Sequence, residues 1–217
     1  MKLYGYRNGR TLRALWTLEE LGMPYEYAEI DLFRGQGREP WFLKINPAGK
    51  VPVLVDDGTI VTESAAICMH LAERHCESHL LPPAGSAERT ELYKWTSFIL
   101  TELDAPLWTI AKHRFALPSE RRVPAVIDTA SWEFANSMKL LAEAVDDRPY
   151  LIGTTFTVAD ILATHIVLWA KSAKLAVTDP LDRYAQNLQK RDAFARARSC
   201  SETGKPLGVS GVVPAAQ

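Results

Sequence analysis

The sequence predicts two domains of different class, an α/β domain over residues 1–80 and an all-helical domain over residues 88–200. Short apolar runs with strand character occur only near the N-terminus, and long stretches with helical periodicity follow residue 88. Between them, residues 81–87 have the proline- and glycine-rich composition of a linker. A chain of 217 residues, 47% of them apolar, can form two such cores.

The first half of the α/β domain reads as a strand, a helix and a second strand. Residues 2–6 are apolar and aromatic, and residues 25–30 repeat that character. The helix expected over residues 11–21 ends at Gly22, as a C-terminal glycine favours. Its apolar positions fall on one face: Ala14, Leu15, Leu18 and Leu21. Two strands joined by a helix predict a right-handed parallel unit.

The second half of this domain adds a looser helix, a hairpin and a closing helix. The helix covers residues 39–45, and the closing helix covers residues 64–75. Between them, residues 53–55 and 60–61 pair across the turn Asp57-Gly58. The resulting order is β-α-β-α-β-β-α.

Pro52 stands directly before the third strand of this order. Because proline cannot donate to a sheet ladder, we expect it where the chain turns into an edge strand, a place that suits a cis Val51–Pro52 bond. With a proline entering the third strand, the order predicts a thioredoxin-like α/β fold.

The second domain shows only helical patterns, over residues 88–115, 123–145, 156–170 and 185–198, the second of which could begin near residues 117–120. The third is apolar nearly all round, so we expect it to be the central helix. Thr157 and Asp160 have the spacing of a capping box at its start. Residues 201–217 are expected to form a loose tail or a strap.

Composition excludes several classes of function. The net charge is −1 with both signs interspersed, so a nucleic-acid partner is not expected. No apolar run reaches the ~18 residues of a membrane span, and the N-terminus lacks the apolar run of a signal peptide. We therefore expect a cytoplasmic protein without a membrane partner.

Cysteine and histidine spacing points to neither a disulfide framework nor a metal site. The three cysteines, Cys68, Cys76 and Cys200, form no C-x-x-C pair. The histidines near Cys76, at positions 70, 75 and 79, are irregularly spaced, and helix periodicity explains His70 better than ligation does. No metal is predicted.

Two short motifs predict a binding site in the first domain. The turn Lys50-Val51-Pro52 leaves the main-chain amide and carbonyl of Val51 available to a ligand backbone. Glu63-Ser64 places a carboxylate, a hydroxyl and free amides at a helix start. Together they predict a site for a small peptide-like molecule that carries both charges.

The redox cysteines of a thioredoxin-like fold are missing at the start of the first helix, because positions 8–11 contain none. Thiol chemistry here would have to take its sulfur from the ligand, which points to glutathione. Four stretches then resemble the glutathione S-transferase family in order and spacing: KLYGYRNGRTLRALWTLEELGMPYE, NPAGKVPVL, TESAAICMHLAE and GTTFTVADI.

This resemblance covers nearly the whole chain. It implies a cytosolic homodimer with a detoxification role, in which glutathione is the co-substrate. The N-terminal domain would bind it, and the helical domain would build the second-substrate pocket. The resemblance implies that Lys50 and Val51 hold the cysteinyl backbone beside Pro52, Glu63 pairs with the α-ammonium and Ser64 takes the α-carboxylate. The alternative interpretations are purely structural: an ordinary edge-strand proline at Pro52, a plain helix cap at Glu63-Ser64 and a solvated surface lysine at Lys50.

The group that activates the thiol is less well marked. In many relatives a serine stands at the position of Gly9, so that hydroxyl is absent here. Asn8, Thr11 and Arg10 are the predicted catalytic residues, through an amide, a hydroxyl and a positive charge. Each also has a structural explanation, as turn residue, N-cap or solvated arginine. Tyr4 and Tyr6 are less favoured candidates, because tyrosines of this strand are more often core residues.

The second-substrate pocket is expected to include Asp104, Trp108, Lys112 and His113, on the helix that lines the pocket in relatives. Core packing and solvation are the alternative explanation for them. The predicted function is transfer of glutathione to a largely apolar electrophile. A glutathione-dependent disulfide reductase and a non-catalytic binding protein remain the alternatives.

Overall fold

A computed structural model describes residues 1–75, 79–146 and 148–205. Cys76, considered above as a metal ligand, lies outside these residues. By their contacts the residues form two compact units, which are described separately. Unit 1 comprises residues 1–81 and the segment from residue 189 onward, and unit 2 comprises residues 82–188. The C-terminal helix, expected from the sequence in the helical domain over residues 88–200, therefore belongs by its contacts to unit 1.

Unit 1 is built on a four-stranded mixed sheet in the order β2-β1-β3-β4. Strand β1 (Lys2–Gly5) pairs in parallel with β2 (Glu26–Glu29), which confirms the parallel unit. Strand β3 (Val53–Asp56) pairs antiparallel with β1 and with β4 (Thr59–Thr62). Asp57 and Gly58 both have positive φ, at 47° and 83°, as the predicted hairpin turn requires.

The expectation that Pro52 enters an edge strand is wrong. Strand β3 lies inside the sheet, between β1 and β4. Pro52 is tolerated because it stands one residue before the strand, where no ladder bond needs its missing N–H.

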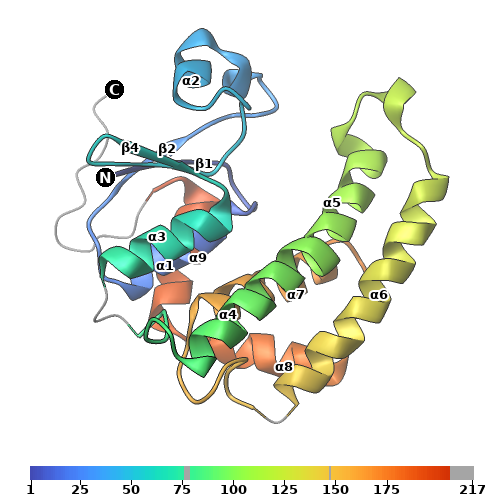
Figure 1. Ribbon diagram of the computed structural model, residues 1–217. Coiled ribbons are helices and arrows are strands. Elements are labelled where there is room, and N and C mark those ends of the chain that lie inside the picture. The colour runs from blue at the N-terminus through green and yellow to red at the C-terminus, as the bar shows by residue number, and fades with distance from the viewer. Residues whose placement is uncertain (76–78, 147, 206–217) are drawn as a thin grey trace. The chain divides into compact units, whose positions relative to one another are not determined.

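Helices cover both faces of this sheet (Figure 1). Helices α1 (Thr11–Glu20) and α3 (Ser64–Arg74) lie together on one face, and α2 (Pro40–Ile45), preceded by the short η1 (Gln36–Arg38), lies on the other. Alternation along the strands explains the two layers, since successive side chains point to opposite faces. Tyr4 and Val53 pack with Phe42 of α2, whereas Gly5 lies against Thr11 of α1.

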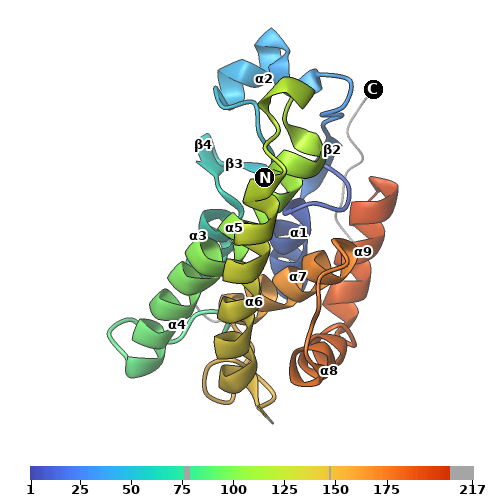
Figure 2. The same ribbon diagram turned by 90° about the vertical axis from the view of Figure 1, so that its right-hand side faces the viewer.

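Helix α9 (Asp192–Thr203) packs along α1 in the same unit (Figure 2). Three side-chain contacts join them: Arg191 with Glu20, Arg196 with Glu19, and Trp16 with Phe194. The single helix expected over residues 185–198 is wrong, because α8 (Asp179–Leu188) ends and α9 begins after a break. The tail expected from residue 201 is wrong at its start, since α9 continues to Thr203; residues 206–217 lie outside the described part.

Unit 2 is helical throughout its regular structure. Helix α7 (Val158–Ser172) contacts α4 (Ala87–Phe98) and α8, and α6 (Ala125–Val145) contacts α5 (Ala105–Ala111) and α8. A short turn, η4 (Ser119–Arg121), precedes α6. The side chains of α7 are buried on nearly every face, which confirms its predicted central position. No helix of the described residues is long and apolar enough to cross a membrane.

The helix predicted over residues 88–115 is one continuous run with two π-helical segments, η2 (Ile99–Asp104) and η3 (Lys112–Ala116). The first lies just before Pro106. Proline has no N–H to bond the carbonyl four residues earlier, and its ring displaces that carbonyl, so the ladder changes register there. The amide of Leu117 likewise bonds the carbonyl of Lys112, five residues back.

The predicted capping box at the start of α7 is confirmed. The carboxylate of Asp160 accepts hydrogen bonds from the amides of Thr157 and Leu151, both at 2.7 Å. It also accepts the hydroxyl proton of Tyr184 on α8. Burial raises the pKa of Asp160, so these donors are what makes its place in the core acceptable.

Asp160→Ala should lower the free energy of unfolding by about 2–4 kcal/mol, because it leaves the amides of Leu151 and Thr157 and the hydroxyls of Thr157 and Tyr184 without their acceptor. Urea denaturation followed by circular dichroism measures the change. Asp128→Ala, at an exposed position of α6, is the control and should change stability by less than about 0.5 kcal/mol. Equal effects of the two substitutions would contradict this account of Asp160.

Candidate functional site

The turn that leads into β3 is held by the side chain of Asn46. Its amide nitrogen donates to the carbonyl of Lys50 at 2.7 Å, and its Oδ1 accepts from the amide of Ala48 at 3.1 Å. Asn46 is buried, so these bonds compete little with water. The side chain therefore sets the path of the chain immediately before Val51.

Gly49, in the same turn, packs against η1. It has a φ of 63°, and a Cβ here would collide with the carbonyl oxygen of Gly37. Only glycine satisfies both the left-handed backbone and this close approach. The turn is thus fastened to the segment before α2 as well as to Asn46.

The Val51–Pro52 peptide bond is cis, as expected from the sequence. The pairing of β3 begins at Val53, so the main chain of Val51 lies outside the sheet ladder. Its side chain packs against the cluster of Ile30, Phe42 and Val53, and Lys50 beside it is exposed. A ligand backbone could therefore bond Val51 as an added strand does.

The start of α3 brings together a strained residue and a buried charge. Glu63 is exposed and has a φ of 64°, uncommon for a residue with a side chain. The hydroxyl of the buried Ser64 accepts a hydrogen bond from Nη1 of Arg13 at 3.2 Å. Arg13 is fully buried on α1. A negative group at Ser64 would therefore meet a guanidinium and the amides of a helix N-terminus.

Arg13 was missed as a site residue at the sequence level. The available signal was an arginine directly before the apolar positions Ala14 and Leu15, inside a helix that packs on the sheet. A buried charge needs compensating groups, so such an arginine indicates a polar partner on a neighbouring element.

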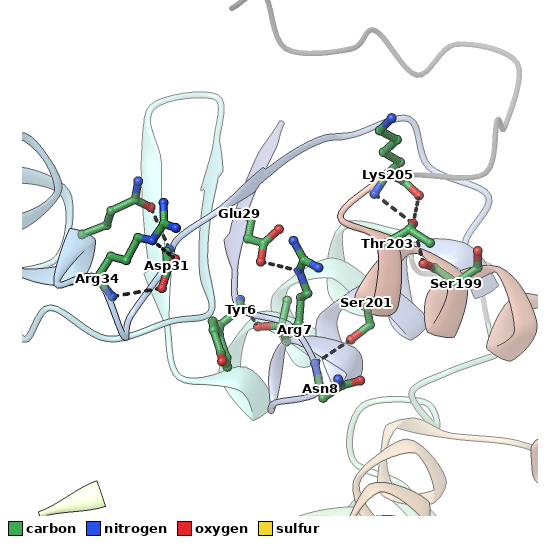
Figure 3. Close-up of polar contacts among 12 residues, drawn as sticks. Tyr6, Arg7, Asn8, Glu29, Asp31, Arg34, Ser199, Ser201, Thr203 and Lys205 are labelled. Atoms are coloured by element: carbon green, nitrogen blue, oxygen red, sulfur yellow. Dashed lines mark hydrogen bonds and ion pairs between the residues drawn. The ribbon is translucent and has the colours of Figure 1, made fainter.

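The loop between β1 and α1 carries the predicted catalytic residues, of which Figure 3 labels Asn8. Asn8 is exposed and has a φ of 53°, and its main-chain amide donates to the hydroxyl of Ser201 at 3.2 Å. The hydroxyl of Thr11 accepts the amide of Tyr6 at 3.0 Å, and Thr11 is 1% exposed. Arg10 is half-buried. Thr11 thus closes the loop, while Asn8 presents its side chain at the surface.

The two tyrosines of this region have aromatic neighbours. Tyr4 packs edge-on against Phe42 and near Trp41, on the α2 side of the sheet. Tyr6 packs against Phe33. Burial, with the nearby charges of Asp31 and Glu29, raises the pKa of Tyr6, so its phenol stays protonated near neutral pH. It could donate a hydrogen bond but not serve as a base.

Neither described cysteine is placed for nucleophilic chemistry. Burial raises the pKa of Cys68 to about 11, against a smaller opposing effect of Arg13. Burial also raises the pKa of Cys200 to about 11. Both thiols are therefore protonated near neutral pH. Within the described residues no group of three or more metal-ligating side chains occurs.

The residues predicted for a second-substrate pocket lie in unit 2. Asp104 ends η2, Trp108 lies in α5, and Lys112 and His113 begin η3. His113 Nδ1 accepts a hydrogen bond from the main-chain amide of Val123 at 3.0 Å, so one of its two ring nitrogens is already bonded within unit 2. Three of the four belong to π-helical segments, which occur frequently at functional sites. The pocket stays a prediction.

Comparison with known proteins identifies the family. Residues 1–73 match the N-terminal domain of glutathione S-transferases, and residues 105–190 match the C-terminal domain. Glutathione S-transferase GstA of Escherichia coli is 31% identical over 181 residues, which cover 81% of this chain and 85% of that protein. The chain belongs to the glutathione S-transferase family.

Other glutathione S-transferases show the same relationship. Glutathione S-transferase 3 of Schizosaccharomyces pombe is 32% identical over 164 residues, covering 76% of this chain and 63% of that protein. The bacterial transferase BphK, solved as a ternary complex, superimposes with a TM-score of 0.83 at 26% identity and covers 93% of this chain and 99% of that one. A sphingomonad glutathione S-transferase complexed with glutathione gives 0.81 at 27% identity, over 93% and 98%. The predicted fold class is confirmed.

Asn46→Ala should loosen the turn of this transferase-family chain, because it removes the groups that bond Lys50 and Ala48. We expect the free energy of unfolding to fall by about 1–3 kcal/mol and trypsin to cleave after Lys50 more readily. Urea denaturation and mass spectrometry of the digest measure the two effects. Asn136→Ala, at the surface of α6, is the control; unchanged cleavage in Asn46→Ala would contradict the role of Asn46.

Proposed function

We propose that this chain is a glutathione transferase that binds glutathione in unit 1, stabilises its thiolate and transfers it to an electrophilic, largely apolar substrate. The observation that carries the proposal is the start of α3, where Ser64 meets the buried Arg13 and Glu63 stands exposed beside it. The negative charge of Glu63 and the positive charge of Arg13, which reaches Ser64, are thereby offered at two consecutive positions of the helix start. The γ-glutamyl end of glutathione carries a matching carboxylate and ammonium.

The turn before β3 supports binding of the rest of the tripeptide. We propose that Val51 bonds the cysteinyl backbone, with Lys50 and Pro52 beside it. Asn46 and Gly49 hold this turn without any ligand, so little ordering cost would fall on binding. The relative solved with glutathione supports this choice of ligand.

The sulfur in this mechanism comes from glutathione. Both cysteines of the described residues, Cys68 and Cys200, are buried with raised pKa values, which supports the ligand as the source of the nucleophile. Lowering a thiol pKa by two units from its ordinary ~8.5 requires about 2.7 kcal/mol. We propose that Asn8, Arg10 and the loop amides supply this stabilisation, with Thr11 holding the loop closed.

We further propose that the helical unit provides the second-substrate pocket through Asp104, Trp108, Lys112 and His113. Trp108 would supply apolar surface, and the other three would favour a substrate with a polar or anionic group. Family membership also supports the proposal of a cytoplasmic homodimer. The domain limits at residues 80 and 88 stay a prediction.

Glu63→Gln should weaken glutathione binding about 10- to 100-fold, because it removes a charged partner of the ligand's ammonium. Isothermal titration calorimetry on the full chain measures the dissociation constant. Glu73→Gln, an exposed glutamate of the same helix, is the matched control and should stay within about twofold of the unchanged protein. Absence of any heat with the unchanged protein would refute the proposed function.

Asn8→Ala should lower kcat with chlorodinitrobenzene about tenfold while the KM for glutathione changes less than about twofold. Because less stabilisation raises the pKa of the bound thiol, the acid limb of the pH–rate profile should move to higher pH. Tyr4→Phe and Tyr6→Phe are the comparison variants. A large loss in either of them, with Asn8→Ala unchanged, would transfer the role to that tyrosine.

The same preparation tests the alternative reaction. A transferase conjugates chlorodinitrobenzene, whereas a glutathione-dependent reductase turns over hydroxyethyl disulfide. Activity only with the disulfide would replace the proposed reaction, and binding without either turnover would favour a non-catalytic role.

A further inference from the structure

Helix α9 is anchored to α1 by charged contacts that leave little freedom. Glu19 is 2% exposed, and its carboxylate accepts from Nε of Arg196 at 2.7 Å. Glu20 accepts both Nε and Nη2 of Arg191, at 2.6 and 2.8 Å, in a two-pronged ion pair. These ion pairs join the beginning and middle of α9 to α1. The position of the last turn of α9 is therefore fixed by contacts with α1, and not by the loop between β1 and α1.

That last turn meets the loop that carries Asn8. Ser201 is 2% exposed, and its hydroxyl accepts the main-chain amide of Asn8 at 3.2 Å, across 193 positions of sequence (Figure 3). Asn8 has a positive φ, which an asparagine adopts more readily than most residues but at a cost. The bond from Ser201 stabilises this conformation.

A second contact holds the same loop at the neighbouring residue, Arg7. Nε of Arg7 bonds Oε1 of Glu29 at 2.5 Å, and Gly204 lies so close to the other carboxylate oxygen that a Cβ there would stand 2.9 Å from it. Gly204 has a φ of 71° and closes α9 with a bond to the carbonyl of Cys200. The end of α9 therefore bonds the loop directly at Asn8, through Ser201, and lies beside Glu29, the partner of Arg7.

We propose that Ser201 is a positioning residue of the transferase reaction. Its hydroxyl holds the main-chain amide of Asn8, so that the side-chain amide of Asn8 is presented to the glutathione sulfur. Ser201 acts through Asn8 and touches no substrate. This inference rests on the proposed function for its catalytic consequence, and its structural part stands independently.

The structural part is tested without any ligand. Ser201→Ala should speed amide hydrogen exchange of Asn8 about tenfold in the full chain, since the amide loses its acceptor. Ser201→Thr keeps a hydroxyl and should restore slow exchange. Ser199→Ala, on the same helix, is the matched control and should not change the exchange of Asn8. Unchanged exchange in Ser201→Ala would overturn the inference.

The catalytic part is tested with glutathione and chlorodinitrobenzene. Ser201→Ala should lower kcat about fivefold, keep the KM for glutathione within about twofold and move the acid limb of the pH–rate profile upward. A double variant with Asn8→Ala should be no slower than Asn8→Ala alone, because Ser201 acts through Asn8. Additive losses, or a loss without a shift of the pH profile, would reduce Ser201 to a merely structural residue.

Failure of the two proposals is distinguishable. If the unchanged chain neither binds nor uses glutathione, the proposed function fails while the exchange experiment still decides the contact between Ser201 and Asn8. If the unchanged chain is active and Ser201→Ala matches it in kcat and pH profile, only the positioning role fails.

Discussion

The buried contact between Arg13 and Ser64 is the constraint on which the candidate site depends. A guanidinium removed from water must be compensated by neighbouring groups, so α1 and α3 are held in one mutual arrangement on the sheet. The same charge lies beneath the start of α3, where helix amides already favour an anion. The same arginine thus has a structural role and, in the proposed function, would also attract an anionic group of the ligand, since electrostatic attraction is strongest where water is excluded.

In the proposed function, two parts of unit 1 have separate roles, one in holding the ligand and one in activating its thiol. The turn at Val51 is fastened by Asn46 and Gly49, and the start of α3 is bonded by Arg13 through Ser64. The loop at Asn8 is held instead by α9, from the other end of the chain. Gly9 supplies no hydroxyl there, so a loop without the usual serine depends more on how its remaining groups are positioned.

Much of the fold could be predicted because the signals are local. Apolar periodicity located α1 and α7, Asp57-Gly58 located the hairpin, and Thr157 with Asp160 located a helix start. The predictions were wrong where contacts between residues far apart in the sequence decide the structure. Pro52 was expected at an edge, but the place of β3 depends on its pairing with β1. The break between α8 and α9 was missed because Gln189 to Arg191 carry no glycine or proline to end a helix.

Sequence alone determined most of the helices and strands, the two motifs that predict the ligand site, and the missing serine at Gly9. These features depend on residue type and on short spacings in the sequence. Such spacings correspond directly to the periodicity of a helix or a strand. Only the tertiary structure decided that Arg13 reaches Ser64, that α9 belongs with the N-terminal unit, and that Ser201 bonds Asn8. Such contacts join residues 51 and 193 positions apart, and no local pattern records which distant side chain a folded chain brings within hydrogen-bond reach.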